Sequence, residues 1–109
     1  MLLFVAMTLA PIPGGYSGPA GSQKESGQRV ALVIEATSFM PASATVHVGD
    51  RVTWTNKDPF PHSVTSRDGS FDSKEIAPGA SWTYRAQRKG TFAYICTLHP
   101  TMKGTLTVK

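Results

Sequence analysis

Cysteine is nearly missing from this chain of 109 residues, because Cys96 is the only one. A single cysteine cannot form an internal disulfide, so the fold must be stabilised by its hydrophobic core. In an exported protein, a lone thiol is a reactive group, an intermolecular partner or a metal ligand. A buried structural thiol is the common alternative. The residues around Cys96 must therefore show whether this thiol is structural or functional.

The sequence also lacks a long hydrophobic run and any window with the 3.6-residue period of an amphipathic helix. Its first ten residues are apolar, but this run is too short to cross a membrane as a helix. The run has the size of a secretory signal, although no positive residue precedes it. We expect export to the periplasm or another extracytoplasmic space, with a disordered or membrane-associated tail as the alternative.

Negative charge is scarce, with 7 Asp and Glu against 11 Lys and Arg and a formal net charge of +4. All charged residues lie from Lys24 onward, so the folded part carries the whole excess. The excess favours an acidic partner surface or an anionic membrane face through long-range steering. The positive residues are scattered and only Arg88 and Lys89 are adjacent, so we do not expect nucleic-acid binding.

Composition divides the chain into two parts. Residues 11–27 are rich in Gly, Pro and Ser, which is typical of a flexible linker. We therefore predict that residues 1–27 are a signal-like segment and linker, and that residues 28–109 form one domain.

Short β-branched and aromatic runs separated by turn residues fill the predicted domain. The pattern predicts strands at residues 29–35, 44–48, 51–55, 62–66, 81–86, 91–96 and 103–109, and a break at residues 39–41. Roughly seven or eight short strands of this kind predict an all-β fold with two packed sheets. Trp54, Trp82, Phe92 and Tyr94 are expected in the core, and His47 on the solvated side of its strand.

Four potential metal ligands stand out in the sequence. Cys96, His99 and Met102 follow one another at intervals of three residues, and His62 lies upstream. A thiolate, two imidazoles and a weak thioether are the ligand set of a blue-copper electron-transfer site. Because Cys96 ends a predicted strand, a short loop can arrange it with His99 and Met102 around one centre, and His62 must come from a neighbouring strand.

Each candidate ligand also has an ordinary structural interpretation. Cys96 and Met102 could be core residues, and His99 could be a surface residue of the loop. The apolar neighbours of His99, namely Leu98, Pro100, Pro59 and Phe60, favour a ligand at the edge of a docking patch. Three strong ligands with a distant thioether suit neither copper oxidation state alone, so that reorganisation on electron transfer is small.

The motifs at residues 48–56, 61–64 and 90–104 resemble those of the cupredoxins, and within the plastocyanin-like group they are most similar to the amicyanins. The Cys-x-x-His-x-x-Met spacing has the short form of the amicyanins. The resemblance implies a Greek-key β-sandwich and a type 1 copper ion with His62, Cys96 and His99 as equatorial ligands and Met102 as the axial ligand. It also implies a carrier of single electrons between larger redox proteins.

Two residues depart from the family pattern. Ser63 stands where many members have Asn, whose backbone N–H contacts the cysteine sulfur and whose side chain ties the two ligand loops. We expect Ser63 to keep the first contact and to reach Thr97 for the second. Leu98 replaces a proline that is common between the Cys and His ligands, which changes the number of N–H donors available to the sulfur.

The leading hypothesis is a monomeric electron carrier that serves redox partners, some with acidic docking surfaces. A periplasmic copper chaperone or reservoir without redox cycling is the alternative, and a metal-free interaction domain is a third. We do not expect an enzyme, because the ligands suffice for one copper site and the sequence shows no Ser/His/Asp arrangement. Stable membrane insertion after processing is not expected.

Overall fold

The computed structural model describes residues 27–109, so the signal-like segment and most of the linker predicted at residues 1–27 lie outside the described residues. Every regular element in the described part is a strand, and no helix there could cross a membrane. The strands are β1 (Arg29–Glu35), β2 (Ser38–Met40), β3 (Ser43–Val46), β4 (Arg51–Asn56), β5 (Thr65–Ser66), β6 (Ser81–Arg85), β7 (Gly90–Cys96) and β8 (His99–Val108).

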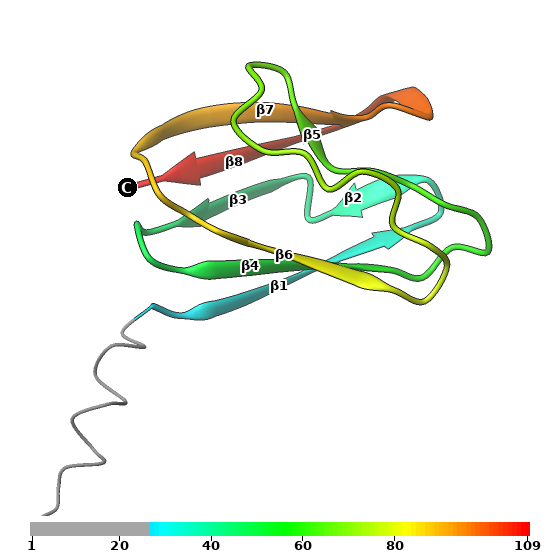
Figure 1. Cartoon of the computed structure of the whole chain (residues 1–109), viewed down its shortest axis with the longest axis horizontal. Helices are drawn as coiled ribbons and strands as arrows, with labels where there is room; N and C mark the ends of the chain where they lie inside the picture. The colour runs from blue at the N-terminus through cyan, green and yellow to red at the C-terminus, as the bar shows by residue number, and fades with distance from the viewer. Residues whose placement is uncertain (1–26) are drawn as a thin grey trace, which may run out of the picture.

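The eight strands form two four-stranded sheets that face each other (Figure 1). One sheet has the order β2-β1-β4-β6 and the other β3-β8-β7-β5. Both sheets are mixed, because β1 pairs with β4 and β3 pairs with β8 in parallel while the other pairs are antiparallel. The prediction of an all-β, two-sheet sandwich is confirmed.

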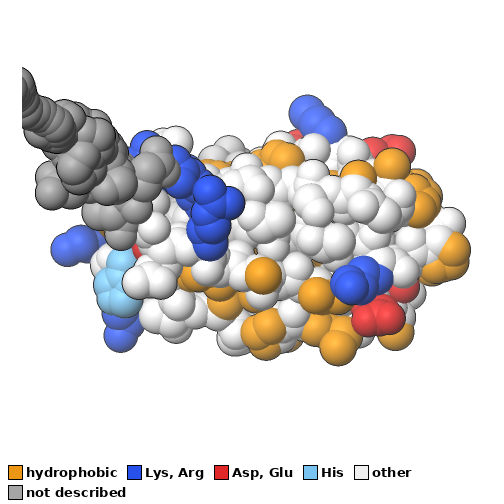
Figure 2. Space-filling model, turned by 90° about the horizontal axis from the view of Figure 1, so that it is seen from below, with side chains coloured by type: hydrophobic (Ala, Val, Ile, Leu, Met, Phe, Trp, Pro, Cys, Tyr) orange, Lys and Arg blue, Asp and Glu red, His pale blue; other side chains and the backbone are white. Residues whose placement is uncertain are grey.

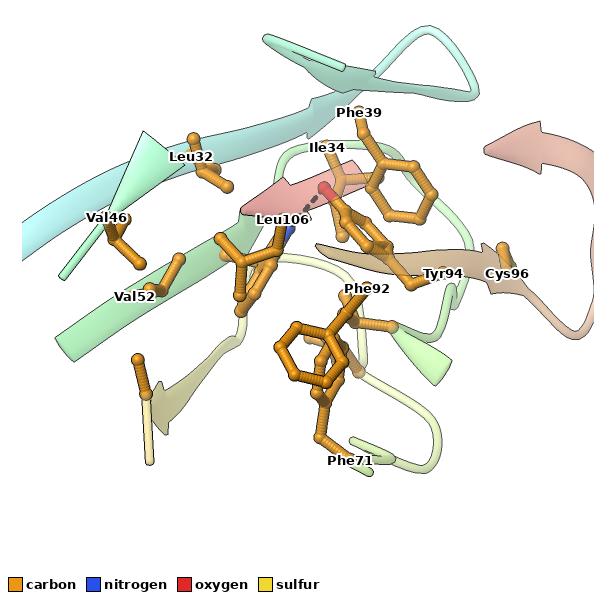
Figure 3. Close-up of a cluster of buried hydrophobic side chains, with 14 of the residues drawn as sticks. Leu32, Ile34, Phe39, Val46, Val52, Phe71, Phe92, Tyr94, Cys96 and Leu106 are labelled. Atoms are coloured by element: carbon orange, nitrogen blue, oxygen red, sulfur yellow. Dashed lines mark hydrogen bonds between the residues drawn. The ribbon is translucent and has the colours of Figure 1, made fainter. Parts of the chain in front are cut away.

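Strict alternation along the central strands builds the core between the sheets. Phe92, Tyr94 and Cys96 point inward from β7, and Val52 and Trp54 point inward from β4. The Trp54 indole N–H donates to the Tyr94 hydroxyl at 3.3 Å, and the two rings meet edge to face (Figure 3). This contact joins one sheet to the other, and burial of such large rings is a main source of folding free energy.

Most predicted core positions are confirmed. Trp54, Phe92 and Tyr94 are buried, while Trp82 is half-buried and packs against the core cluster. The side chain of His47 is 73% exposed, which confirms its predicted solvated position.

Three predicted segments differ from the structure. Residues 39–41 were expected to interrupt the strand pattern, but Phe39 and Met40 belong to strand β2. This strand forms because Ala36 and Thr37 adopt positive φ and reverse the chain direction after β1. Of residues 62–66, only Thr65–Ser66 are a strand, and His62 instead forms an isolated bridge with Ile76. The last strand, β8, begins at His99 and not at residue 103.

Candidate metal centre

Three of the four predicted ligands meet at one end of the sandwich. One donor atom each from His62, Cys96 and His99 lies within 4.8 Å of the other two. The Cys96 Sγ is 3.7 Å from His62 Nδ1 and 3.9 Å from His99 Nδ1. Cys96 and His62 are fully buried, whereas His99 is partly exposed and so lies at the solvent edge of the cluster.

A tight hairpin places Cys96 next to His99. Cys96 ends β7 and His99 begins β8, so that only Thr97 and Leu98 lie between the strands. Cys96 and His99 are paired across the ladder, with a bulge between Ile95 and Cys96. The three-residue interval is thus a turn between two paired strands, with His99 already the first residue of β8.

Met102 lies on β8 and not in a loop before it. Its side chain is 3% exposed and belongs to the same buried cluster as Cys96. From Met102 onward, every second residue of β8 faces the interior, namely Met102, Gly104, Leu106 and Val108. This position suits an axial ligand and a core residue equally, so the geometry of the other three donors has to define the centre.

The second nitrogen of His62 is bound to a carboxylate that the sequence analysis did not single out. His62 Nε2–H donates to Asp58 Oδ2 at 2.7 Å, and the backbone N–H groups of Ala36 and Thr37 donate to the same carboxylate at 2.7 and 2.9 Å. This bond leaves Nδ1 as the nitrogen that faces Cys96. Asp58 lies in a segment without helix or strand, so its spacing from His62 gave no sequence signal of this contact.

Asp58 is held in its ionised form. Burial by itself raises the pKa of this carboxyl group, but hydrogen bonds from Thr37, His62 and Ala36 together lower the pKa below its usual value. A buried carboxylate beside His62 orients the ring and makes its free nitrogen a better electron donor to a metal.

The segment that carries His62 is fixed by a buried amide. The Asn56 side chain donates to the carbonyl groups of Phe60 and Ile76 at 2.9 and 3.0 Å and accepts the Asp58 N–H at 2.9 Å. The backbones of His62 and Ile76 exchange two further hydrogen bonds, of 3.2 and 2.7 Å. Hydrogen bonds within the protein thus set the position of His62.

Ser63 makes both contacts expected of it. Its backbone N–H donates to Cys96 Sγ at 3.3 Å, and its hydroxyl lies 3.1 Å from the Thr97 hydroxyl and accepts the Thr97 N–H at 2.9 Å. Serine therefore replaces the asparagine of many family members in tying the His62 segment to the β7–β8 turn. The sulfur receives an N–H donor, which stabilises a thiolate.

Apolar side chains surround the exposed edge of the cluster. Phe60 and Leu98 are 41% and 43% exposed, which is high for residues of this size. The Phe60 ring packs against His62 and His99, with centroids 5.2 and 5.8 Å away. The apolar surroundings predicted for His99 are therefore present at these two positions.

Comparison with known families decides the classification. The family model for the cupredoxin-like domain matches residues 1–108. The chain belongs to the cupredoxin-like family. This cupredoxin is 28% identical over 109 residues to amicyanin-alpha of Methylorubrum extorquens, covering 95% of the chain and 86% of the relative. It is 34% identical over 92 residues to plastocyanin of Scenedesmus fuscus, covering 68% of the chain and 89% of the relative.

Solved cupredoxin structures have the same fold. An amicyanin variant in its Cu(I) form matches with a TM-score of 0.70 and 26% identity, over 74% of this chain and 82% of that one. The Cu-containing nitrite reductase of Thermus scotoductus also matches with a TM-score of 0.70 and 26% identity. The alignment covers 74% of this cupredoxin but only 22% of the reductase, so the chain corresponds to a small part of that enzyme.

The donors of this cupredoxin fit a copper ion. The cluster offers a thiol and two imidazole nitrogens within 4.8 Å of one another. These soft and borderline donors suit copper, whereas hard cations such as Mg²⁺ prefer oxygen ligands. Binding deprotonates the thiol, and the positive ion itself favours that step. Within residues 27–109 this is the only such group of His, Cys, Asp and Glu side chains.

Proposed function

We propose that this cupredoxin is an exported electron carrier that holds one copper ion and cycles it between Cu(I) and Cu(II). His62, Cys96 and His99 are the strong ligands, and Met102 is the weak axial one. The observation that carries the proposal is the convergence of three donor atoms within 4.8 Å in a frame of internal hydrogen bonds. A rigid frame changes little when the ion changes its charge, which favours fast electron transfer.

The surface around His99 supports exchange with redox protein partners. His99 is the solvent-edge ligand, and the exposed Phe60 and Leu98 side chains lie on the segments beside it. An exposed apolar patch of this kind is typical of a contact surface for another protein. A partner docked there approaches the copper ion through the exposed edge of the His99 ring.

A copper chaperone is the second candidate, but burial of the ligands favours the carrier. Cys96 and His62 are each 0% exposed, so an acceptor protein cannot reach them to take the metal without opening the fold. We propose no catalytic role, because the relatives that the chain spans most fully are amicyanins and plastocyanins, and the nitrite reductase is spanned over only 22%.

Copper loading tests the proposal. The full chain should bind one copper ion, show the intense blue colour of a type 1 thiolate site and take up and release one electron reversibly. The Cys96→Ser variant should lose the colour, while Met40→Leu, at an exposed methionine, should keep it. A chain that stays colourless after Cu(II) loading contradicts a type 1 site, and a coloured chain that gives copper up rapidly to an acceptor supports the chaperone.

A further inference from the structure

Three hydroxyl groups lead from the β7–β8 turn to a carboxylate at the protein surface. The Thr97 hydroxyl lies 3.1 Å from that of Ser63, which in turn lies 3.0 Å from that of Thr65. The Thr65 hydroxyl donates to Asp72 Oδ1 at 3.1 Å. We call the side chains of Thr97, Ser63 and Thr65 the hydroxyl row. Asp72 is not among the grouped donors of the candidate metal centre, so the row joins that centre to a carboxylate outside it.

The carboxylate sets the direction of every hydrogen bond in the hydroxyl row. Each hydroxyl has one hydrogen to donate, and an ionised carboxylate has none. Because Thr65 gives its hydrogen to Asp72, it can only accept from Ser63, and Ser63 can then only accept from the Thr97 hydroxyl. The Ser63 oxygen also accepts the Thr97 backbone N–H at 2.9 Å. One oxygen thus holds Thr97 by two hydrogen bonds.

The fold keeps Asp72 beside Thr65 although the side chain of Asp72 is 41% exposed. The two residues form an antiparallel bridge. Next to it, the Ser73 N–H donates to the Val64 carbonyl at 2.9 Å, and the Val64 N–H donates to the Ser73 hydroxyl at 2.8 Å. The Lys74 N–H donates to Asp72 at 2.9 Å and is the main cause of a lowered pKa for this carboxyl group, which is therefore ionised at neutral pH.

We infer that Asp72 is a positioning residue for the β7–β8 turn and, through that turn, for Cys96 and His99. Hydrogen bonds that run in one direction toward a charge polarise and strengthen one another. Without the carboxylate the hydroxyl groups can reverse or bond to water, and Ser63 loses one of its two fixed bonds to Thr97. An effect on copper rests on the proposed function, whereas the position of the turn does not.

The position of this turn matters because it leads into the solvent-edge residue of the centre. The turn lies at the right of Figure 1, and hydrophobic side chains gather toward the same end on the face seen in Figure 2. His99 begins β8 directly after the turn, and the exposed Leu98 lies within it. A turn that moves away from the His62 segment changes both the spacing of the donors and the apolar surface beside them.

Hydrogen exchange in the metal-free full chain tests the hydroxyl row. The Thr97 N–H should exchange about threefold to tenfold faster in Asp72→Ala and in Thr65→Val, as measured by NMR, because each change weakens about one hydrogen bond to Thr97. Thr65→Ser keeps a hydroxyl at this position and should keep the slow exchange of the parent chain. The double variant Thr65→Val, Asp72→Ala should exchange no faster than the single variants, since either change alone interrupts the row.

The copper-loaded chain gives a readout that a merely structural role would not move. The Ser63 N–H donates to Cys96 Sγ at 3.3 Å, and hydrogen bonds to this sulfur tune the reduction potential of a type 1 site. Thr65→Val changes no charge and loosens Ser63, so it should lower the potential, because an N–H donor favours the electron-rich Cu(I) state. Thr65→Ser should leave the potential unchanged. Voltammetry measures both.

Matched substitutions separate the hydroxyl row from general effects. Thr53→Val removes a hydroxyl that bonds to another hydroxyl in the opposite sheet, and it should change neither the Thr97 exchange nor the potential. Asp68→Ala removes an exposed carboxylate that bonds within its own turn, and it should leave the Thr97 exchange unchanged. Circular dichroism shows which variants are folded. Asp72→Ala and Thr65→Val interrupt the row at different points, so one folded variant suffices.

Several results would overturn the inference. Unchanged Thr97 exchange in the row variants, or equal changes in the controls, would show that Asp72 does not position the turn. Faster exchange with an unchanged potential in Thr65→Val would show that the position of the turn does not reach the donors. A parent chain that binds no copper contradicts the proposed function instead, and the exchange rates of the metal-free chain then still decide whether Asp72 positions the turn.

Discussion

Asp58 constrains the candidate metal centre through its hydrogen bond to His62. Its carboxylate fixes the His62 ring and also receives two backbone N–H groups from the β1–β2 turn. We predict that Asp58→Asn weakens Cu(II) binding by about tenfold or more and raises the reduction potential, because a neutral partner makes the imidazole a poorer donor to Cu(II). Copper titration and voltammetry measure the two effects.

Asp68→Asn is the matched control for this substitution. Asp68 is exposed, and its carboxylate bonds to Ser66 and Ser70 of its own turn. The Asp68→Asn variant should leave both the copper affinity and the reduction potential unchanged. An Asp58→Asn variant with unaltered affinity and potential would show that the carboxylate does not influence the metal centre.

Met102 gives a second prediction at this scale. If its thioether is the weak axial ligand, then Met102→Gln should lower the reduction potential while copper stays bound, because an amide oxygen favours Cu(II). If Met102 is only a core residue, the variant should lose stability with no change in potential. Voltammetry and chemical unfolding distinguish the two, with the exposed Met40→Gln as control.

Sequence reasoning at the residue scale predicted the three side chains that meet at this end and the contacts of Ser63, but not Asp58 or Asn56. Cys96, His62 and His99 were predictable because few residue types bind copper and their spacing is short. The roles of Asp58 and Asn56 were not predicted, because a buried polar residue in or beside a loop looks the same in the sequence as an exposed one. Only the folded chain shows that the side chain of Asn56 bonds to two carbonyl groups.

At the scale of elements, the sequence predicted β1 and β4 well, but β2, β5 and the start of β8 poorly. β1 is a β-branched apolar run and β4 alternates, and their observed bounds agree with the prediction to within one residue. β2 has only three residues and depends on the positive φ of Ala36 and Thr37, which these residue types do not signal. β8 starts early because pairing with β7 extends to the Cys96–His99 pair.

The pairing of β7 with β8 supports a prediction about close packing. Gly104 lies opposite Tyr94, and an added Cβ would stand only 2.3 Å from the Tyr94 ring. We predict that Gly104→Ala lowers the free energy of unfolding by about 2 kcal/mol or more, because the buried ring has little room to shift. Urea unfolding measures the loss.

Gly69→Ala is the comparison for this substitution. Gly69 has open space around its Cα and a φ of +81°, so alanine there meets only backbone strain. Its cost should be about 1 kcal/mol. A Gly104→Ala variant as stable as Gly69→Ala would mean that the Tyr94 ring moves without loss of the contact between the two sheets.

The whole molecule separates two surfaces on opposite ends of one rigid sandwich. The end with Phe60, Leu98 and His99 is apolar and carries the candidate metal donors. At the other end, the strand register places Arg51 beside Arg29 on β1 and Arg85 on β6. The two-sheet architecture was predictable from the sequence, because seven or eight short alternating runs leave few other arrangements. The proximity of Arg29, Arg51 and Arg85 was not predictable from the sequence, because these residues are far apart in the chain and only the strand register brings them together.

Asp50 links the stability of the whole molecule to pH. Hydrogen bonds from the backbone N–H groups of His47 and Gln28 lower the pKa of this carboxyl group, although its burial acts in the opposite direction. Because the folded-state pKa lies below the unfolded one, the contribution is fully present above about pH 4 and is lost as the pH falls through the folded-state pKa. We therefore expect Asp50→Asn to cost about 2 kcal/mol at pH 7.

The difference between the parent chain and Asp50→Asn should shrink as the pH falls from 5 to 3, because the parent carboxylate becomes protonated and neutral as well. Urea unfolding at pH 7, 5 and 3 measures it, with Asp68→Asn as control, since Asp68 is exposed and bonds to Ser66 and Ser70 of its own turn. A difference that stays constant down to pH 3 would mean that the charge of Asp50 is not what holds Gln28 and the β3–β4 turn together.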